Sequence, residues 1–197
     1  MKLIIASNNA HKITEIKAIL GEYFSDIQSL RDAGIDIDVV EDADTFEGNA
    51  LKKAQEVFDI AHADAVLSDD SGLMVDALDG APGVYSARFA GEGHDDEANN
   101  NKLLDVLKDV PDEKRTARFT SAIALVRKDK EPLISRDFVE GRIMWAPRGE
   151  NGFGYDPLFF YEPLNKSFAE LDPDEKNQVS HRKRALEAMR EMLESEK

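Results

Sequence analysis

The stretch KLIIASNNAHK, residues 2–12, decides the class of fold that the chain adopts. Its first half is a short apolar run typical of a buried strand, and Ile13, Ile16 and Leu20 then recur at helical spacing. Residues 7–12 are therefore predicted to form a turn that leads from a strand into a helix. A strand followed at once by a helix is the repeating unit of α/β proteins.

The same alternation continues along the chain. After the helix-capping pair Asp44-Thr45, apolar residues at helical spacing predict a second helix that ends near His62. Further helices are predicted at 95–107 and 181–194, strands at 65–68, 117–127, 133–143 and 158–161, extended chain at 73–78, a turn at 80–83 and a glycine-rich loop at 149–157. This order predicts an α/β fold with a mixed sheet flanked by helices.

Composition bounds the class of protein. The 197 residues, 42% hydrophobic and 33% charged, are typical of a soluble globular chain, and we expect one domain over residues 1–197, or at most two lobes sharing a sheet. No apolar run approaches the roughly 20 residues that span a bilayer. The first apolar run is too short for a signal peptide, so we expect a cytoplasmic protein without membrane contact.

Charge and cysteine content narrow the possible partners. A formal net charge of −15 repels polyanions, so we expect no nucleic-acid partner, although a small anion can bind where lysines and arginines converge. The chain has no cysteine, so disulfides and thiolate ligands are excluded. Oxygen ligands favour Mg²⁺ over Zn²⁺.

Polar side chains gather where the first two helices begin. Residues 7–12 place hydroxyl, amide and ammonium groups at a helix N-terminus, which attracts phosphate, although an ordinary cap with a solvated lysine is the alternative. Glu41 and its acidic neighbours either complement the dipole of the second helix or supply a ligand for Mg²⁺. Lys53 matters only if the start of that helix faces a phosphate site.

The segment Asp69-Asp70-Ser71-Gly72 is predicted to be a loop at the carboxyl end of a short buried strand. Ligands bind at this edge of open α/β sheets. One carboxylate can coordinate a metal and accept a proton from water, while Ser71 donates to a phosphate oxygen. The alternative, an Asx-turn relieved by Gly72, is equally compatible with the local sequence.

The last quarter of the chain holds a third group of candidates. In Asn151-Gly152-Phe153-Gly154-Tyr155-Asp156-Pro157, glycines allow close approach of the backbone, an aromatic face can stack on a purine, and a carboxylate can accept hydrogen bonds. A tight turn between core aromatics is the alternative. Lys176 and the pair His181-Arg182 could recognise an anion or a base edge, whereas His181 alone is more typical of a structural histidine.

Taken together, five segments resemble the inosine triphosphate pyrophosphatase family in order and spacing, over nearly the whole chain. They are residues 7–12, 67–73, 80–88, 152–157 and 180–182. The resemblance implies a homodimer of elongated α/β subunits, each with two lobes and a central active-site groove for a purine triphosphate and Mg²⁺. Members of that family convert ITP, dITP and XTP to the monophosphate and pyrophosphate, which clears these non-standard purines from the nucleotide pool.

Carried over motif by motif, the resemblance implies a role for each matching residue. Glu41 and Asp70 are expected to hold Mg²⁺, with Asp70 also the proton acceptor for the attacking water, and Lys53 is expected to be a catalytic contact. The triphosphate is expected to contact Ser7, Asn8, Asn9, Ala10, His11, Lys12 and Ser71. The base and sugar are expected to lie among Phe153, Gly154, Tyr155, Asp156, Lys176, His181 and Arg182.

The residue types agree with that chemistry. Because a triphosphate carries close to four negative charges, Lys12, Lys53 and Lys176 together with Mg²⁺ can offset them, which requires a cationic pocket in an acidic protein. Rejection of ATP is expected at the purine 6-position, an acceptor in hypoxanthine and xanthine but a donor in adenine. Such mismatches can discriminate by as much as ~10⁴-fold.

The chain departs from the family pattern twice. Asn8 stands where the family commonly has glycine, which we expect to be tolerated because asparagine visits left-handed backbone angles. The family often places glutamate directly before Asn49-Ala50, whereas here Glu47 comes one residue earlier and Gly48 intervenes. One residue turns a helical side chain by about 100°, so Glu47 is not expected to be a ligand.

Two other hypotheses make different predictions. A Maf-type nucleotide pyrophosphatase would show Ser-Pro-Arg-Arg where this chain has Ser7-Asn8-Asn9-Ala10. A regulatory module that binds purine nucleotides without turnover would bind ITP but release no pyrophosphate.

Overall fold

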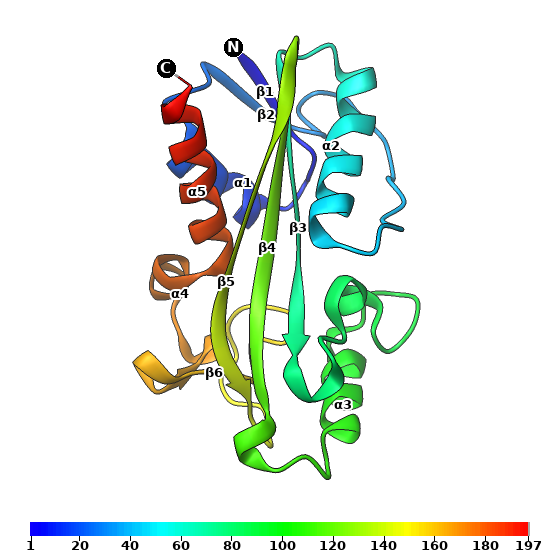
Figure 1. Cartoon of the computed structure of the whole chain (residues 1–197), viewed down its shortest axis with the longest axis vertical. Coiled ribbons are helices and arrows are strands. Elements are labelled where there is room, and N and C mark those ends of the chain that lie inside the picture. The colour runs from blue at the N-terminus through cyan, green and yellow to red at the C-terminus, as the bar shows by residue number, and fades with distance from the viewer. Residues whose placement is uncertain (197) are drawn as a thin grey trace. The chain divides into compact units, whose positions relative to one another are not determined.

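The computed structural model describes residues 1–196 and, for His11, the backbone alone. It contains a mixed sheet of seven strands in the order β2-β1-β3-β4-β5-β6-β7 (Figure 1). The strands are β1 (Lys2–Ile5), β2 (Asp26–Ser29), β3 (Ala65–Val75), β4 (Thr116–Arg127), β5 (Lys130–Ile143), β6 (Phe159–Tyr161) and β7 (Lys166–Ser167). The α-helices are α1 (Ala10–Leu20), α2 (Phe46–Ala61), α3 (Asp96–Val106), α4 (Pro173–Val179) and α5 (His181–Ser195). The predicted α/β class and mixed sheet are confirmed.

Two compact units make up the described chain, and each has its own core. Unit 1 comprises residues 1–70 and 121–137 together with the chain from Arg182 onward, and unit 2 comprises residues 71–120 and 138–181. Because the divisions fall within β3, β4 and β5, these three strands contribute residues to both units.

Unit 1 is built on the strand-turn-helix with which the chain begins. β1 pairs in parallel with β2 and with β3. Helices α1 and α5 cover one face of these strands and α2 covers the other (Figure 1). Side chains alternate between the faces, as strand geometry requires. The core on the α1 and α5 side comprises Leu3, Ile5, Ile16, Leu20, Phe24, Ala65, Leu67, Ile123, Leu125, Ala185, Leu186, Met189 and Leu193.

Helix α2 begins and ends as predicted. Thr45 is its N-cap, and the Thr45 hydroxyl accepts a hydrogen bond from the N–H of Gly48 at 3.0 Å. His62 ends the helix in the left-handed conformation, with a φ of 44°. The cap satisfies a backbone donor that has no partner within the helix.

In unit 2, α3 and a cluster of phenylalanines pack against the parts of β3, β4 and β5 that belong to this unit. Phe119 and Phe159 lie 4.6 Å apart between ring centroids, and Leu103 and Leu107 of the α3 segment join the same core. Arg115 is fully buried, and its guanidinium donates to the carbonyls of Leu107, Ile143 and Met144. Uncharged acceptors thus satisfy a buried cation.

The structure corrects the prediction of a loop at 69–72. β3 continues from Ala65 to Val75 through both aspartates, and Gly72 does not adopt a positive φ. The Asx-turn alternative is therefore also wrong. The strand can continue because buried partners from other elements satisfy the Asp69 and Asp70 carboxylates, so the chain does not need to turn toward water.

Smaller differences have local causes. The predicted extended segment 73–78 gives way after Val75 to a 3₁₀ turn, Asp76–Leu78. β2, β7 and α4 were not predicted, because each is short and lacks a clear apolar period. Asn8 keeps an ordinary backbone conformation, so the left-handed argument for its tolerance is wrong. Its side-chain oxygen instead accepts from the N–H of Arg31 at 2.8 Å.

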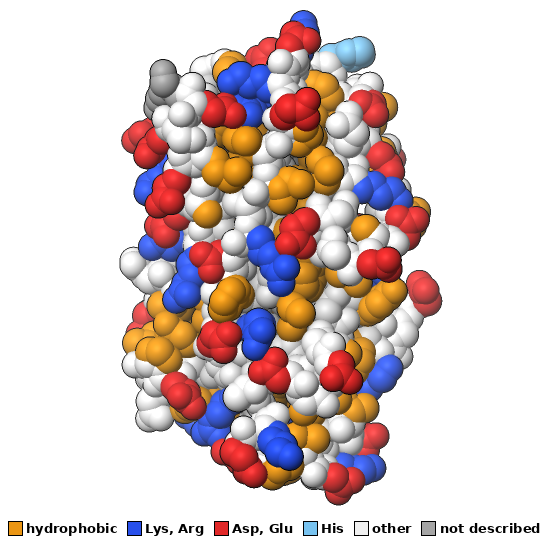
Figure 2. Space-filling view, in the orientation of Figure 1, with side chains coloured by type: hydrophobic (Ala, Val, Ile, Leu, Met, Phe, Trp, Pro, Cys, Tyr) orange, Lys and Arg blue, Asp and Glu red, His pale blue; other side chains and the backbone are white. Residues whose placement is uncertain are grey.

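Within residues 1–196, no helix has both the length and the apolar character needed to cross a bilayer. On the face drawn in Figure 2, acidic and basic side chains are interspersed, and the lysines and arginines do not gather into a stripe. This face therefore offers no extended basic surface of the kind that tracks a phosphate backbone.

Candidate active site

The two aspartates of β3 lie just past the end of its parallel neighbour. β1 ends at Ile5, and the N–H of Ala6 still donates to the carbonyl of Leu67 at 2.8 Å. Asp69 and Asp70 follow in β3, beyond the last residue paired with β1. They therefore occupy the carboxyl end of the parallel strands in unit 1, where α/β proteins bind ligands.

Asp69 is the centre of a buried ion-pair network. Lys12 Nζ lies 2.6 Å from Asp69 Oδ1, and Arg182 Nε lies 3.0 Å from Asp69 Oδ2. Burial alone would raise the pKa of Asp69, but the charges of Lys12 and Arg182 outweigh it and hold this pKa far below its ordinary value. Arg182 also pairs with Glu15 of α1 at 3.4 Å. The network therefore joins α1, β3 and α5.

Lys53 connects α2 to the same cluster. Its ammonium forms a close ion pair with Glu41 and donates to the backbone carbonyl of Asp69 at 3.3 Å. Burial lowers the pKa of Lys53, but the neighbouring carboxylates, with Glu41 first, raise it overall. Lys53 is thus a charged, partly buried group beside the aspartates, and it is not a surface lysine.

Asp70 differs from its neighbour in that its side-chain partner is neutral. Asn49 of α2 is fully buried and donates from Nδ2 to Asp70 Oδ2 at 3.0 Å, while Asn49 Oδ1 accepts from the N–H of Ala43 at 2.8 Å. Burial, followed by the charge of Glu41, raises the pKa of Asp70 to about 6. The two adjacent aspartates therefore have pKa values shifted in opposite directions.

The donor set at Asp70 and Glu41 fits a hard divalent cation. The two carboxylates are close enough for Glu41 to raise the pKa of Asp70, and a cation between them would relieve this repulsion. Among the described residues, no group of three or more histidines, aspartates and glutamates is arranged to hold a metal by itself. Mg²⁺ in phosphate-handling sites commonly takes one or two carboxylates, with water and substrate oxygens completing the shell.

The ion-pair cluster around the two aspartates contains more acids than cations. Its cations are Lys12, Lys53 and Arg182, and its acids are Glu15, Glu41, Asp69 and Asp70. Each of these three cations is paired with a carboxylate, and the cluster contains one more acid than cations. A polyanion needs additional positive charge here, which is the second reason why the site suits a divalent cation.

The first loop is held by its own side chains. Ser7 Oγ accepts from the N–H of Asn9 at 3.1 Å, and Asn9 Oδ1 accepts from the N–H of Lys12 at 3.2 Å. Asn9 thus caps α1, which begins at Ala10. His11 lies in the first turn of α1, and its side chain is outside the described part of the chain.

The predicted base-binding segment forms a compact loop in unit 2. Phe153 is 51% exposed, whereas Tyr155 and Asp156 are buried. Asp156 Oδ2 accepts from the N–H of Phe153 at 2.9 Å and from Lys176 Nζ at 2.5 Å. Gly152 has a φ of +77°, and a Cβ there would lie 2.1 Å from Asp156 Oδ2, so only glycine lets the carboxylate fold under the loop.

Lys176, whose side chain is 15% exposed, lies against the exposed ring of Phe153. Lys176 Nζ lies 4.4 Å from the centroid of the Phe153 ring, a cation–π contact. The side chain of His181 is buried and stacks on Phe119, with ring centroids 5.1 Å apart. Phe153, Asp156, Lys176 and His181 all belong to unit 2, whereas Arg182 belongs to unit 1. Ser71 is a half-buried residue of β3.

Gly48, which stands where the family often has glutamate, has little room for a side chain. A Cβ on Gly48 would lie 2.9 Å from the Cβ of Ala43, closer than side chains normally approach. Glu47 pairs with Arg136 at 2.9 Å, which agrees with leaving it out of the metal ligands. In this chain the segment before α2 packs against the helix where an acid would otherwise project.

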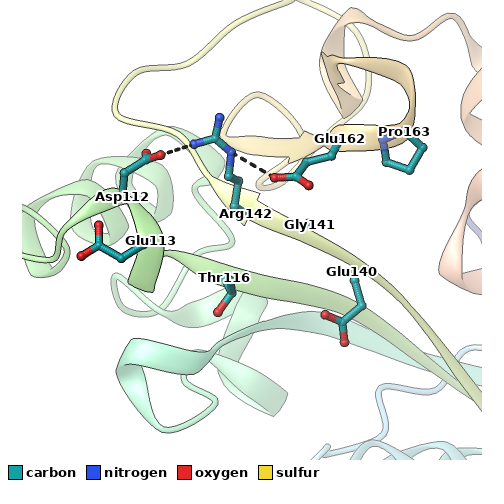
Figure 3. A pocket seen from close by; sticks show the side chains of 8 residues that line it. All are labelled: Asp112, Glu113, Thr116, Glu140, Gly141, Arg142, Glu162 and Pro163. Atoms are coloured by element: carbon teal, nitrogen blue, oxygen red, sulfur yellow. Dashed lines mark hydrogen bonds and ion pairs between the residues drawn. The ribbon is translucent and has the colours of Figure 1, made fainter.

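A surface hollow elsewhere does not fit a triphosphate. It encloses about 630 Å³ in unit 2, and Arg142 within it is bound by Asp112 at 2.5 Å and by Glu162 at 3.7 Å (Figure 3). The lining is mainly acidic: Asp112, Glu113, Thr116, Glu140, Gly141, Arg142, Glu162 and Pro163. None of the predicted site residues lies there, and the acids would repel phosphate.

Comparison with known proteins identifies the family. The family model of the Ham1 family matches residues 3–192. This chain belongs to the Ham1 family. A protein of Leuconostoc mesenteroides named dITP/XTP pyrophosphatase is 52% identical over 98% of this chain and 96% of its own length. A protein of Clostridium perfringens with the same name is 50% identical over 98% and 97% of the two chains.

Solved structures of Ham1 proteins support the same assignment. The Staphylococcus aureus Ham1 protein superposes with a TM-score of 0.91 and 40% identity, covering 100% of each chain. A nucleoside-triphosphatase, dITP/XTP pyrophosphatase, from Mycobacterium abscessus has a TM-score of 0.80 and 44% identity, covering 96% of this chain and 98% of its own. The resemblance stated from the five segments is therefore confirmed, and so is the fold class.

Sequence reasoning missed residues that organise this Ham1 site. Asn49 holds Asp70, and Asp69 holds both Lys12 and Arg182. Asn49 carried one available signal, since it is a polar residue next to Ala50 on the apolar side of a predicted amphipathic helix. The role of Asp69 had no local signal, because its partners lie 57 and 113 residues away in the chain.

Proposed function

We propose that this chain hydrolyses non-standard purine nucleoside triphosphates, namely dITP, XTP and ITP, to the monophosphate and pyrophosphate in the presence of Mg²⁺. The observation that supports it most is a buried carboxylate, Asp70, held by Asn49 beside Glu41 and Lys53, in a chain that is about half identical to proteins named dITP/XTP pyrophosphatase. It follows that Asp70 is the first residue to test.

The proposed reaction is a displacement at the α-phosphorus. The oxygen of a water molecule bonds to that phosphorus, the bond to the oxygen bridging toward the β-phosphorus breaks, and pyrophosphate leaves. Asp70 accepts the proton of the attacking water. One oxygen of Asp70 is held by Asn49, which orients the carboxylate so that its other oxygen can act.

Lys12 and Lys53 are the cations of unit 1 that we assign to the phosphates. Both are partly exposed, at 20% and 19% of their side chains, so substrate oxygens can reach them. They offset the charge that develops on the leaving pyrophosphate. Their present carboxylate partners, Asp69 and Glu41, keep them oriented before substrate binds.

Glu41 and Asp70 are the residues proposed to hold Mg²⁺. When bound, the cation supplies Lewis-acid stabilisation of the phosphate oxygens and offsets the excess of carboxylates at this site. Removal of divalent cations with EDTA is expected to abolish turnover, and addition of Mg²⁺ in excess is expected to restore it. Full activity after chelation would remove the metal from the proposal.

The base is proposed to stack on Phe153, with Lys176, Asp156, His181 and Arg182 around the base and sugar. The exposed Phe153 ring supports this role, because an aromatic face that is not needed for the core is available to a purine. Arg182 is 4% exposed and engaged with Asp69 and Glu15, so for this residue the role rests on family resemblance alone.

Assembly and location complete the proposal. We propose a homodimer, by family resemblance. We also propose that it acts in the cytoplasm, because its relatives are named as enzymes that act on free nucleotides. Sedimentation equilibrium tests the first point: a mass near twice 22.0 kDa supports the dimer, and a mass of one chain contradicts it.

A pyrophosphate-release assay tests the activity against the regulatory alternative. Wild type and Asp70→Asn are compared with ITP, dITP, XTP, ATP and GTP in Mg²⁺. Release from the first three substrates, lost in the variant, supports the proposal. Binding of ITP without pyrophosphate release would favour the regulatory module.

A further inference from the structure

The peptide groups on both sides of Gly154 are held by one helix. Asp96 Oδ2, in the first turn of α3, accepts from the N–H of Gly154 at 2.7 Å. Asn100, one turn later, donates from Nδ2 to the carbonyl of Gly154 at 2.8 Å. Residues four apart lie on one face of a helix, so one face of α3 binds both backbone groups of Gly154 in the loop 152–157.

Gly154 can be held only in this way. It has a φ of +59° and no side chain to bury, so its backbone groups are the only available anchors. Its neighbours on the C-terminal side are fixed differently: Tyr155 packs in the core and donates its hydroxyl to the carbonyl of Ser86 at 2.7 Å, and Asp156 is buried. Gly154 is therefore anchored through its backbone to α3. Phe153, the residue before it, has its own N–H held by the Asp156 carboxylate, and its ring is half exposed.

Helix α3 is itself fixed in unit 2. Leu103 and Leu107 pack into the core, and Asn99 donates to the carbonyl of Ala87 at 3.1 Å and accepts from the N–H of Ala90 at 2.7 Å. Because both the core contacts and the hydrogen bonds of Asn99 fix α3, the helix can serve as a fixed support for the loop that contains Gly154. The Phe153 ring, which is half exposed, has no comparable burial of its own.

We propose that Asp96 and Asn100 are positioning residues for substrate binding: by holding Gly154 they present the Phe153 ring to the purine base. This inference rests on the proposed function, in which Phe153 stacks on the base. Because stacking is made equally in the ground state and the transition state, its loss raises KM and leaves kcat nearly unchanged.

The test compares Asp96→Ala and Asn100→Ala with matched neighbours on the same helix. Glu97→Ala removes an exposed acid from the same first turn, and Asn101→Ala removes an exposed amide beside Asn100. The KM for ITP is expected to rise about 3- to 10-fold in the two test variants, as for loss of one hydrogen bond. The kcat is expected to stay within about twofold, and the two controls are expected to match wild type.

The conservative variant Asp96→Asn separates positioning from charge. An asparagine oxygen can still accept from the N–H of Gly154, so Asp96→Asn is expected to restore a KM near that of wild type. A KM as high as in Asp96→Ala would show that the negative charge matters and would contradict the positioning role. Equal effects of Glu97→Ala would contradict it as well.

A measurement without substrate keeps the inference independent of the activity. Amide hydrogen exchange at Gly154, followed by NMR on the full chain, is expected to speed up in Asp96→Ala and to stay unchanged in Glu97→Ala. An unchanged exchange rate in Asp96→Ala would contradict the proposal that Asp96 holds Gly154, independently of any effect on catalysis. If wild type does not hydrolyse ITP, the proposed function fails, whereas the exchange experiment still decides whether α3 holds the loop.

Discussion

At the scale of single residues, the site depends on two adjacent aspartates with opposite surroundings. Asp69 has two cations against it, whereas Asp70 has the amide of Asn49 and the charge of Glu41. Because neighbouring residues in a strand point to opposite faces, Asp69 faces the α1 and α5 side while Asp70 faces α2. The alternation of the strand therefore puts Asp69, which holds the ion-pair network together, on one face and Asp70, the proposed proton acceptor, on the other.

Asp70→Asn is expected to lower kcat for ITP by about 10²- to 10⁴-fold, the usual contribution of a general base, and to leave the thermal unfolding midpoint nearly unchanged. Asparagine keeps the shape of the side chain but cannot take the proton. Steady-state pyrophosphate release measures the effect, with Asp59→Asn on the exposed side of α2 as control. Retention of more than a tenth of the activity would rule out Asp70 as the proton acceptor.

Asp69→Asn is expected to destabilise the fold by about 3–5 kcal/mol, because it leaves the buried Arg182 and the partly buried Lys12 without their carboxylate. Urea unfolding measures the change in free energy. Asp42→Asn, which breaks the exposed pair with Lys52, serves as control and is expected to have little effect. Equal stability of the two variants would mean that the buried network contributes nothing.

At the scale of elements, the sequence predicted most of the helices and strands that have a regular apolar period. Helix α2, with its Thr45 cap and His62 end, follows the predicted boundaries, because apolar period and capping residues are local signals. β3 was predicted to stop at Ser68, because two aspartates in a row normally end a strand. Their partners come from α1, α2 and α5, and a local pattern contains no information about such distant contacts.

The start of α2 gives a prediction in which two effects oppose each other. Gly48→Ala improves helix propensity by about 1 kcal/mol, but the new Cβ would lie 2.9 Å from the Cβ of Ala43. Overpacking typically costs about 1–3 kcal/mol, so the variant is expected to be less stable than wild type. Chemical unfolding measures the difference.

The double variant Ala43→Gly with Gly48→Ala provides the control. It removes the opposing methyl group and is expected to recover stability relative to Gly48→Ala, after allowance for the single Ala43→Gly change. A stabilised Gly48→Ala variant would show that the segment before α2 moves aside freely.

Glu196, the residue after α5, makes a pH-dependent contact. Hydrogen bonds from Arg127 and Lys130 lower the pKa of Glu196 to about 2. Because the pKa is lower in the folded chain than in the unfolded one, the contact stabilises the fold above a pH of about 4.5 and is lost as the pH falls toward 2. Wild type is therefore expected to be more stable than Glu196→Gln at pH 7, with the difference vanishing near pH 2. A difference that persists at pH 2 would contradict the ion-pair explanation.

At the scale of the whole molecule, family membership followed from the order of motifs and not from any one of them. The segments at 7–12, 67–73 and 152–157 are each compatible with an ordinary turn or cap, and only their joint spacing is specific. The Ham1 family model and the solved Ham1 structures confirm this assignment. That residues 1–197 form a single domain stays a prediction.

The charges show what the sequence could not provide. Counting lysines near the motifs predicted a cationic pocket, but Lys12, Lys53 and Arg182 are each already paired with a carboxylate. Pairing depends on which side chains meet in space, and a sequence records only their order. The neighbouring carboxylates of Asp70 and Glu41 support the proposed dependence on Mg²⁺, which the oxygen ligands of this cysteine-free chain also favour.

The central claim is that this Ham1 chain hydrolyses non-standard purine triphosphates with the buried Asp70 as proton acceptor. One measurement tests the hydrolysis most directly. Pyrophosphate release is followed with dITP, XTP and ATP as separate substrates in Mg²⁺. We predict rapid release from dITP and XTP, with kcat/KM for ATP lower by as much as ~10⁴-fold. Equal kcat/KM values for ATP and dITP, or no pyrophosphate from any of them, would contradict the account.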